Sequence, residues 1–208
     1  MTKLIWILLG LTIAPSTSHA YLSFLNTGQV VKTGNYRLGI SPQFITVSDV
    51  GEGMNMSGRF DTGISDDADF RAVVGVGRVE FHVGGLYKWV PIPDTPDQPA
   101  IGVSLGAFYA RQSSIGTFSV RGFPFVSKRF DTQAGMFDPF VSLPLGLSST
   151  SSTTEFPVQF VLGTEWMPAG LEKISFWVEG GFNVSKAFSY LSLMVTLDWD
   201  DANGIEFR

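Results

Sequence analysis

His82 is the residue of this sequence best suited to proton transfer near neutral pH. Glu80 stands two positions before it, so in an extended strand both side chains share one face, where a carboxylate can orient an imidazole. A serine nucleophile would complete a hydrolytic triad, but Val83 and Gly84 follow His82 and no His-x-Ser pairing occurs. We therefore expect His82 to belong to a polar network rather than to a catalytic centre.

Glu165 and Glu179 are a second pair that could do chemistry, because they fall on neighbouring expected strands and two close carboxylates can support acid–base catalysis. Each has a simpler role if a cation faces it across an enclosed interior, with Arg59, Arg71 and Lys88 as candidates. We favour ion pairing and expect no enzymatic activity. The predicted charge network inside the fold has six members: Arg59, Glu80, His82, Lys88, Glu165 and Glu179.

The composition excludes several other kinds of site. The chain has no cysteine and 2 histidines, and one of these, His19, lies in the export signal predicted below. A metal site of thiolates or of several imidazoles is therefore excluded, whereas an all-carboxylate site stays open. With 14 Lys and Arg against 19 Asp and Glu, the net charge of −5 offers no basic footprint for nucleic acid. We expect no cofactor, no bound metal and no nucleic-acid partner.

The elements that position these residues are predicted to be β-strands. Apolar residues alternate with polar or small ones at period two, in segments of about ten residues, which is typical of transmembrane barrel strands. The clearest segments are 54–64, 79–89, 101–110, 137–147, 156–166, 174–184 and 191–199, and weaker ones are 36–47, 70–77 and 118–129. Pro42 and Pro124 interrupt two of the weaker segments and predict strand ends or bulges there.

These segments predict an all-β fold: a closed antiparallel up-and-down transmembrane barrel of about ten strands, with eight or twelve as alternatives. Ten strands place the long connection 91–99 at the same end as both chain termini. In outer-membrane barrels that end faces the periplasm and usually carries short turns, so this loop is a test of the count.

The distribution of charge between the two faces separates a membrane barrel from a soluble one. The apolar faces of the seven clear segments carry no charged residue, whereas a water-facing exterior would need many. The charges all fall on the opposite faces, which a polar lumen can accept. Aromatic residues near the ends of the apolar faces fit the headgroup level of a bilayer: Tyr87, Trp89, Tyr109, Phe156, Trp166 and Trp199.

The first twenty residues predict a cleaved export signal. Lys3 is followed by the apolar run 4–13, and Ser18-His19-Ala20 offers a small-x-small cleavage site before Tyr21. Ten apolar residues are too few for a membrane-spanning helix, which needs about 20. The expected divisions are a signal peptide (1–20), an N-terminal lead-in (21–33), the barrel (34–199) and a C-terminal tail (200–208).

Residues 191–199, an alternating strand ending on Trp199, resemble the C-terminal strand that outer-membrane proteins present to their assembly machinery. With the pattern of 34–199, this makes the chain similar to the small bacterial outer-membrane β-barrel proteins, without a specific subfamily. The resemblance implies the bacterial outer membrane as location, and its lipid and assembly machinery as partners. The sequence departs from the usual pattern in that Asp200 to Arg208 follow the aromatic residue.

A structural role in the cell envelope, or a narrow porin-like passage for small solutes, is the function expected of such a barrel. Barrels of eight to ten strands have interiors largely filled by side chains, so polar groups should fill the lumen. Two alternatives stay open: an envelope barrel enzyme that modifies lipid A or cleaves proteins, and a soluble periplasmic lipid-binding barrel. No small-molecule substrate is indicated.

Overall fold

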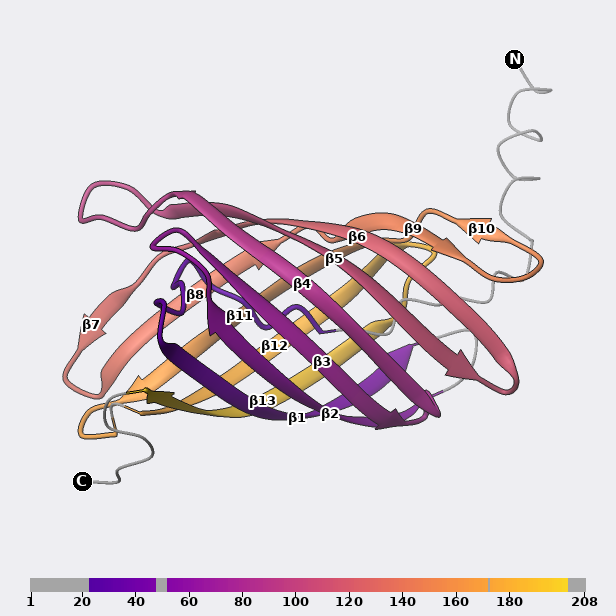
Figure 1. Ribbon diagram of the computed structural model, residues 1–208, viewed down its shortest axis with the longest axis horizontal. Helices are drawn as coiled ribbons and strands as arrows, with labels where there is room; N and C mark the ends of the chain where they lie inside the picture. Colours follow the sequence, from indigo (N-terminus) through magenta and orange to yellow (C-terminus); the bar gives the residue numbers. More distant parts are fainter. Residues whose placement is uncertain (1–22, 48–51, 172, 202–208) are drawn as a thin grey trace, which may run out of the picture.

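The computed structural model describes residues 23–47, 52–171 and 173–201, and all its regular elements are strands (Figure 1). The predicted signal peptide and its cleavage site before Tyr21 lie outside the described residues. The first six strands are β1 (Asn35–Val47), β2 (Gly53–Gly63), β3 (Ala68–Gly77), β4 (Phe81–Ile92), β5 (Ala100–Gln112) and β6 (Ile115–Ser127). The others are β7 (Phe130–Thr132), β8 (Gly135–Ser142), β9 (Leu145–Ser149), β10 (Thr154–Glu155), β11 (Val158–Pro168), β12 (Ile174–Ser185) and β13 (Ser189–Asp200).

The strands form a closed antiparallel barrel of ten strands, which confirms the predicted fold class and strand number. Each of the ten barrel strands pairs with the barrel strands before and after it in the chain, and β1 closes the barrel against β13 from Asn35↔Asp200 onward. Strands β8 and β9 together make one barrel strand between β6 and β11. Strands β7 and β10 are hairpin extensions that pair only with β8 and β9 respectively.

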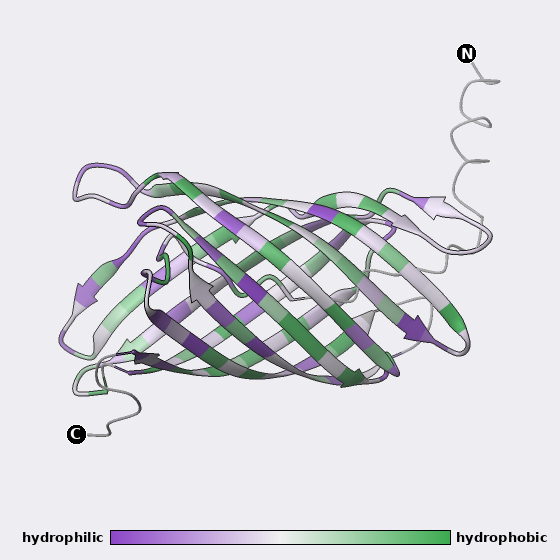
Figure 2. Ribbon diagram, viewed as in Figure 1, coloured by the Kyte–Doolittle hydropathy of each residue, from purple (hydrophilic) through white to green (hydrophobic). Residues whose placement is uncertain are grey.

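Alternation along the strands separates an apolar exterior from a polar interior, and the hydropathy colours of Figure 2 alternate accordingly. On β12, Val178 is 40% exposed, whereas its neighbours Trp177 and Glu179 are buried. The same holds around the barrel, where the exposed large side chains include Leu38, Ile40, Phe60, Val74, Tyr87, Leu105, Val120, Val141, Leu162 and Leu193. No described helix has the length and apolar character needed to cross a membrane.

Val79 differs from the prediction that placed it on the apolar exterior. Strand β4 begins at Phe81, so Val79 lies in the bend between β3 and β4 and is fully buried. It packs inside the barrel in a cluster with Ile45, Ala110 and Tyr190. The strict alternation therefore starts two residues later than the sequence pattern indicates.

The prolines interrupt the hydrogen-bond ladder without ending the strands. Strand β1 runs through Pro42, and its pairing with β13 skips from Ile40 to Gln43. The Ser41 hydroxyl donates to the Leu193 carbonyl at 2.7 Å, which satisfies an acceptor beside the gap. Strand β6 likewise continues through Pro124, opposite the break between β8 and β9.

The connection between β4 and β5 lies at the end of the barrel where β1 begins and β13 ends, here called the terminal end. A barrel of ten strands places this connection at the terminal end, so a long loop does occur there. The Lys128 ammonium anchors the loop through the Asp94 carboxylate at 2.9 Å and through loop carbonyls, including that of Thr95. Burial raises the pKa of Asp94, but hydrogen bonds from Lys128 and the Arg129 amide outweigh it and hold the pKa below its ordinary value.

Candidate functional site: a lumen occupied by the N-terminal segment

Residues 23–31, here called the plug segment, run through the inside of the barrel, where Figure 1 draws them as an indigo trace between the walls. Phe24, Leu25, Asn26 and Thr27 are all at most 3% exposed. The predicted N-terminal lead-in is therefore, in its described part, an internal element and not a peripheral one. Its position defines the site, because most charged lumen groups contact it.

Glu179 of β12 holds the plug segment by its main chain. Its two carboxylate oxygens accept hydrogen bonds from consecutive amides, that of Phe24 at 2.7 Å and that of Leu25. The Tyr190 hydroxyl of β13 donates to the same carboxylate at 2.6 Å. Three donors on one buried carboxylate replace the cation that the sequence analysis assigned to Glu179, and no ion pair to it occurs in the described parts of the chain.

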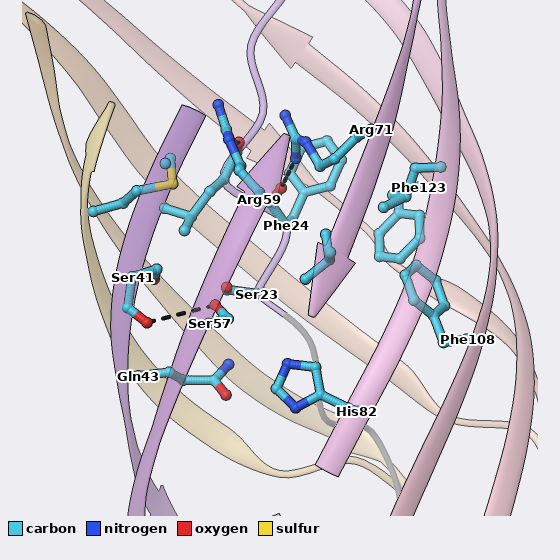
Figure 3. Close-up of a pocket in the computed structure, with 15 residues that line it drawn as sticks. Ser23, Phe24, Ser41, Gln43, Ser57, Arg59, Arg71, His82, Phe108 and Phe123 are labelled. Atoms are coloured by element: carbon cyan, nitrogen blue, oxygen red, sulfur yellow. Dashed lines mark hydrogen bonds between the residues drawn. The ribbon is translucent and has the colours of Figure 1, made fainter. Parts of the chain in front are cut away.

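Two arginines bind the carbonyls of the same two residues. The Arg59 guanidinium of β2 donates to the Leu25 carbonyl at 2.6 Å, and that of Arg71 of β3 donates to the Phe24 carbonyl at 2.9 Å, a contact drawn in Figure 3. Leu25 has φ = +38°, in the left-handed region that residues with a Cβ rarely adopt. Carboxylate and guanidinium groups thus together stabilise an irregular backbone.

The remainder of the plug segment is bonded in the same manner toward the terminal end. The Asn26 side-chain amide donates to the Ser104 hydroxyl at 3.0 Å, and the Gly28 amide donates to the Ser127 hydroxyl at 2.7 Å. Further along, the Lys88 ammonium donates to the Gln29 carbonyl, and the Val31 amide donates to the Asp69 carboxylate at 3.0 Å. The buried backbone groups named here are therefore satisfied by lumen side chains, as burial demands.

The Phe24 ring fills an aromatic sector of the lumen. It stacks on Phe123 at a centroid distance of 5.5 Å and also contacts Phe125 and Phe140 at 5.5 and 5.8 Å. Centroid distances of 4.5–7 Å are the favourable range for aromatic pairs. These rings lie on inward faces that the sequence analysis treated simply as polar.

Two ion pairs in the wall join register partners on neighbouring strands. Arg71 binds Asp61, its register partner on β2, at 2.9 Å, and Lys88 binds Asp69, its register partner on β3, at 2.8 Å. Directly opposed residues in antiparallel strands have side chains close enough for such pairing. The centre of the lumen is already taken by the plug segment.

Arg37 is a further centre of ion pairing in the wall, and it was not among the predicted site residues. It binds Asp198 of β13 through two bonds of 2.6 Å and lies 3.4 Å from the Glu165 carboxylate. Glu165 therefore has a cation, though not one of the predicted candidates. The same carboxylate accepts a hydrogen bond from the Thr27 hydroxyl of the plug segment at 3.4 Å.

Of the six residues predicted to converge in the lumen, five lie there: Arg59, His82, Lys88, Glu165 and Glu179. Glu80 is the correction. It is exposed in the bend before β4 and accepts a hydrogen bond from the Ser113 amide at 3.0 Å, outside the lumen. Because β4 begins only at Phe81, the alternation that put Glu80 on the inward face does not extend to it.

His82 lines a cavity of about 20 Å³ between the plug segment and the wall, room for about one water molecule. Ser23, Gln43 and Ser57 lie around the same end of it in Figure 3. His82 Nδ1 and Gln43 Nε2 are buried without a hydrogen-bond partner in the described parts of the chain. The predicted carboxylate orienter, Glu80, lies outside the cavity, so this geometry supports no hydrolytic triad.

Several functional residues escaped the sequence analysis: Arg37, Asp61, Asp69, Ser104, Ser127 and the plug segment itself. Their partners depend on strand register, which alternation alone does not specify. One signal was available in the sequence, since Phe108, Phe140 and Trp177 stand on faces that otherwise carry polar residues. Buried rings of this kind require an apolar partner inside the barrel, and Phe24 supplies it for Phe140. Among the described residues no group of three or more His, Asp or Glu is arranged to hold a metal ion.

Comparison with known proteins finds no matching family model and no matching curated sequence. Among solved structures, the chain is similar to the translocator domain of the autotransporter NalP from Neisseria meningitidis, with 11% identity and a TM-score of 0.48 over 95% of this chain and 96% of that one. A de novo designed transmembrane β-barrel gives 11% identity and a TM-score of 0.41 over 82% and 100%. The N-terminal β-barrel domain of Pseudomonas aeruginosa OprF gives 10% and 0.37 over 80% and 98%.

Proposed function

We propose that this chain is a structural β-barrel of the bacterial outer membrane, closed by its own N-terminal segment and without covalent chemistry. The apolar exterior supports insertion in lipid, because a soluble barrel would need charges on its outward faces. Aromatic residues at the terminal end, among them Tyr36, Phe60 and Trp199, contact one another at the level expected for headgroups. This exterior argues against the soluble lipid-binding alternative.

The closed state is inferred from one observation: the Glu179 carboxylate accepts hydrogen bonds from the Phe24 and Leu25 amides inside the lumen. The segment so held leaves a cavity with room for about one water molecule, far less than a solute path needs. Within the described residues His82 Nδ1 has no hydrogen-bond partner, and Glu165 is ion-paired with Arg37, which supports a non-catalytic interior.

Planar-bilayer recording of the full-length protein tests the proposal. We expect small or absent conductance for the parent protein and stepwise conductance for a variant in which Phe24 and Leu25 are both replaced by Asp. Aspartates there would place carboxylates in the buried apolar cluster that holds Phe24 and Leu25 and would remove the ring contacts with Phe123, so the plug segment should leave the lumen. Heat-modifiable gel migration establishes that both proteins are folded barrels. Large, stable conductance of the parent protein would reject the closed barrel.

A narrow passage for small solutes is the second candidate, favoured by the polar and charged lining that the plug segment covers. Arg59, Arg71 and Lys88 all donate to carbonyls of the plug segment. If this segment moves, these three cations lose their carbonyl acceptors and face the lumen, where Arg71 and Lys88 keep their ion pairs with Asp61 and Asp69. Brief anion-selective openings of the parent protein under applied voltage would support a gated passage over a purely structural role, and a parent protein that never opens would support the structural role.

A further inference from the structure

The lumen contacts the plug segment mainly through main-chain atoms. Four amides, those of Phe24, Leu25, Gly28 and Val31, donate to lumen side chains. Three carbonyls, those of Phe24, Leu25 and Gln29, accept from lumen cations. Main-chain groups are the same in every peptide apart from proline, so recognition of this kind depends little on sequence.

At two positions of the plug segment the fit depends on the side chain, and these positions define a spacing in the sequence. The Phe24 ring occupies the sector formed by Phe123, Phe125 and Phe140. Four residues later, a Cβ on Gly28 would lie 2.2 Å from the Ala100 Cβ, a separation that two carbon atoms cannot adopt. A peptide that fits the site therefore needs an aromatic residue followed, four positions later, by glycine.

The side chain between these two positions that makes apolar contacts is Leu25, which belongs to the same buried cluster as Phe24. Asn26 contributes one hydrogen bond to Ser104 and a longer one from Arg71, and Thr27 one weak contact to Glu165 at 3.4 Å. These are few and individually modest beside the charge-assisted bonds to the main chain.

We propose that the lumen is a peptide-binding site: it binds an extended segment by its main chain, with an aromatic residue and a glycine in the spacing Phe-x-x-x-Gly. The covalently attached plug segment is one occupant, and a separate peptide of this pattern binds in its place once that segment is detached. The inference rests on the proposed function, because it takes the closed barrel as the starting state.

Detachment is possible after folding, because Lys32 and Thr33 are exposed at the terminal end where the plug segment leaves the lumen. A recognition sequence for a specific protease, inserted after Thr33 in the full-length protein, allows the folded barrel to be cut in detergent. A fluorescent peptide copying residues 21–33, labelled at its C-terminal end, is then added to cut and uncut protein. Binding is followed by fluorescence anisotropy and by co-elution in gel filtration.

We expect the labelled peptide to bind the cut barrel and not the uncut one, since a tethered segment competes at an effective concentration of order millimolar. If the original fragment instead stays with the barrel through gel filtration after cutting, this also supports the inference, because the fragment is then held without a covalent bond. Release of the fragment with no binding of the labelled peptide would overturn the inference.

Peptide variants separate main-chain recognition from side-chain recognition. N-methylation at the positions of Phe24 and Leu25 removes the two donors to Glu179 and should weaken binding about tenfold or more. Gly28→Ala should abolish binding because of the contact with Ala100. Asn26→Ala should change affinity by less than about tenfold. Equal binding of the N-methylated and parent peptides would reject main-chain recognition.

The peptide-binding experiment and the conductance test can fail separately. A parent protein that conducts rejects the closed barrel but leaves peptide binding to the cut protein measurable. A parent protein that does not conduct, with no binding of the labelled peptide after release, keeps the structural barrel and rejects the peptide site.

Discussion

The two sides of the lumen wall hold the plug segment by different physical means. Strands β2 to β4, with Glu179 of β12, present charged groups that bind its amides and carbonyls. Strands β5, β6 and β8 present aromatic rings and hydroxyl groups, and the Phe24 ring packs among the rings. The charged side satisfies buried polar backbone, and the aromatic side provides apolar burial.

This division explains how a polar lumen can enclose a peptide tightly. Hydrogen bonds to charged groups would not by themselves favour the lumen over water, because water also bonds to amides and carbonyls. Apolar packing alone would bury unsatisfied backbone groups at a cost of about 1–3 kcal/mol each. The two sides together remove both penalties, and each can be weakened separately.

Glu179→Ala tests the charged side and should have the largest effect. It removes the acceptor of three buried donors, the Phe24 and Leu25 amides and the Tyr190 hydroxyl, so unfolding free energy in detergent should fall by about 3–5 kcal/mol. Glu179→Gln is the matched control, because it retains one acceptor and the shape, and should lose less. Equal losses for the two variants would mean that the retained acceptor and side-chain shape contribute nothing, and no loss in either variant would mean that the contacts of Glu179 do not stabilise the barrel.

Phe24→Ala tests the aromatic side. Loss of the ring from among Phe123, Phe125 and Phe140 should cost about 3 kcal/mol, the lower part of the range for Phe→Ala, because the lumen can take up water. Phe44→Ala is the control, since Phe44 is 41% exposed on the exterior. Chemical denaturation monitored by tryptophan fluorescence compares them. A smaller effect for Phe24 than for Phe44 would show that the aromatic side contributes little.

Val178→Arg extends the comparison from the inner wall to the outer one. Val178 is on the exterior next to Glu179, so an arginine there faces lipid and should cost about 2–4 kcal/mol at the midplane. Val178→Leu keeps the residue apolar and should be nearly neutral. Refolding titrations into lipid vesicles measure both. Tolerance of the arginine would contradict an exterior in contact with lipid.

Sequence alternation predicted the exterior well because an outward-facing position here requires only that a side chain be apolar. Leu38, Leu105 and Val178 satisfy this regardless of which strand lies beside them. The interior requires particular partners, and these depend on register: Arg71 binds Asp61, and Arg37 binds Asp198 and approaches Glu165. Period two assigns a face to a residue but no partner.

The plug segment was not predicted for a related reason. A stretch such as Phe24 to Gly28 has neither strand alternation nor helical periodicity, and its conformation is imposed by Glu179, Arg59 and Arg71. The error at Glu80 has a local origin, because the pattern continues through a bend where the strand does not. Sequence thus indicated the interior charges but not what they hold.

The loop at the terminal end provides the smallest test, of a group outside the barrel strands. The Lys128 ammonium and the Arg129 amide lower the pKa of Asp94 despite its burial, so the ionised carboxylate stabilises the folded state. A depressed pKa contributes stability above the unfolded value of about 3.9, and this contribution is lost as the pH falls through the folded pKa. Asp94→Asn should therefore cost under about 1 kcal/mol at pH 7.

The same difference between parent protein and Asp94→Asn should stay constant from about pH 7 to 5 and shrink below about pH 4. Thermal unfolding in detergent across this range measures it, and Asp97→Asn in the same loop serves as the control for a change of charge alone. A difference that grows toward low pH would mean that the carboxylate is held in its protonated form, and that Lys128 anchors the loop through its carbonyl contacts only.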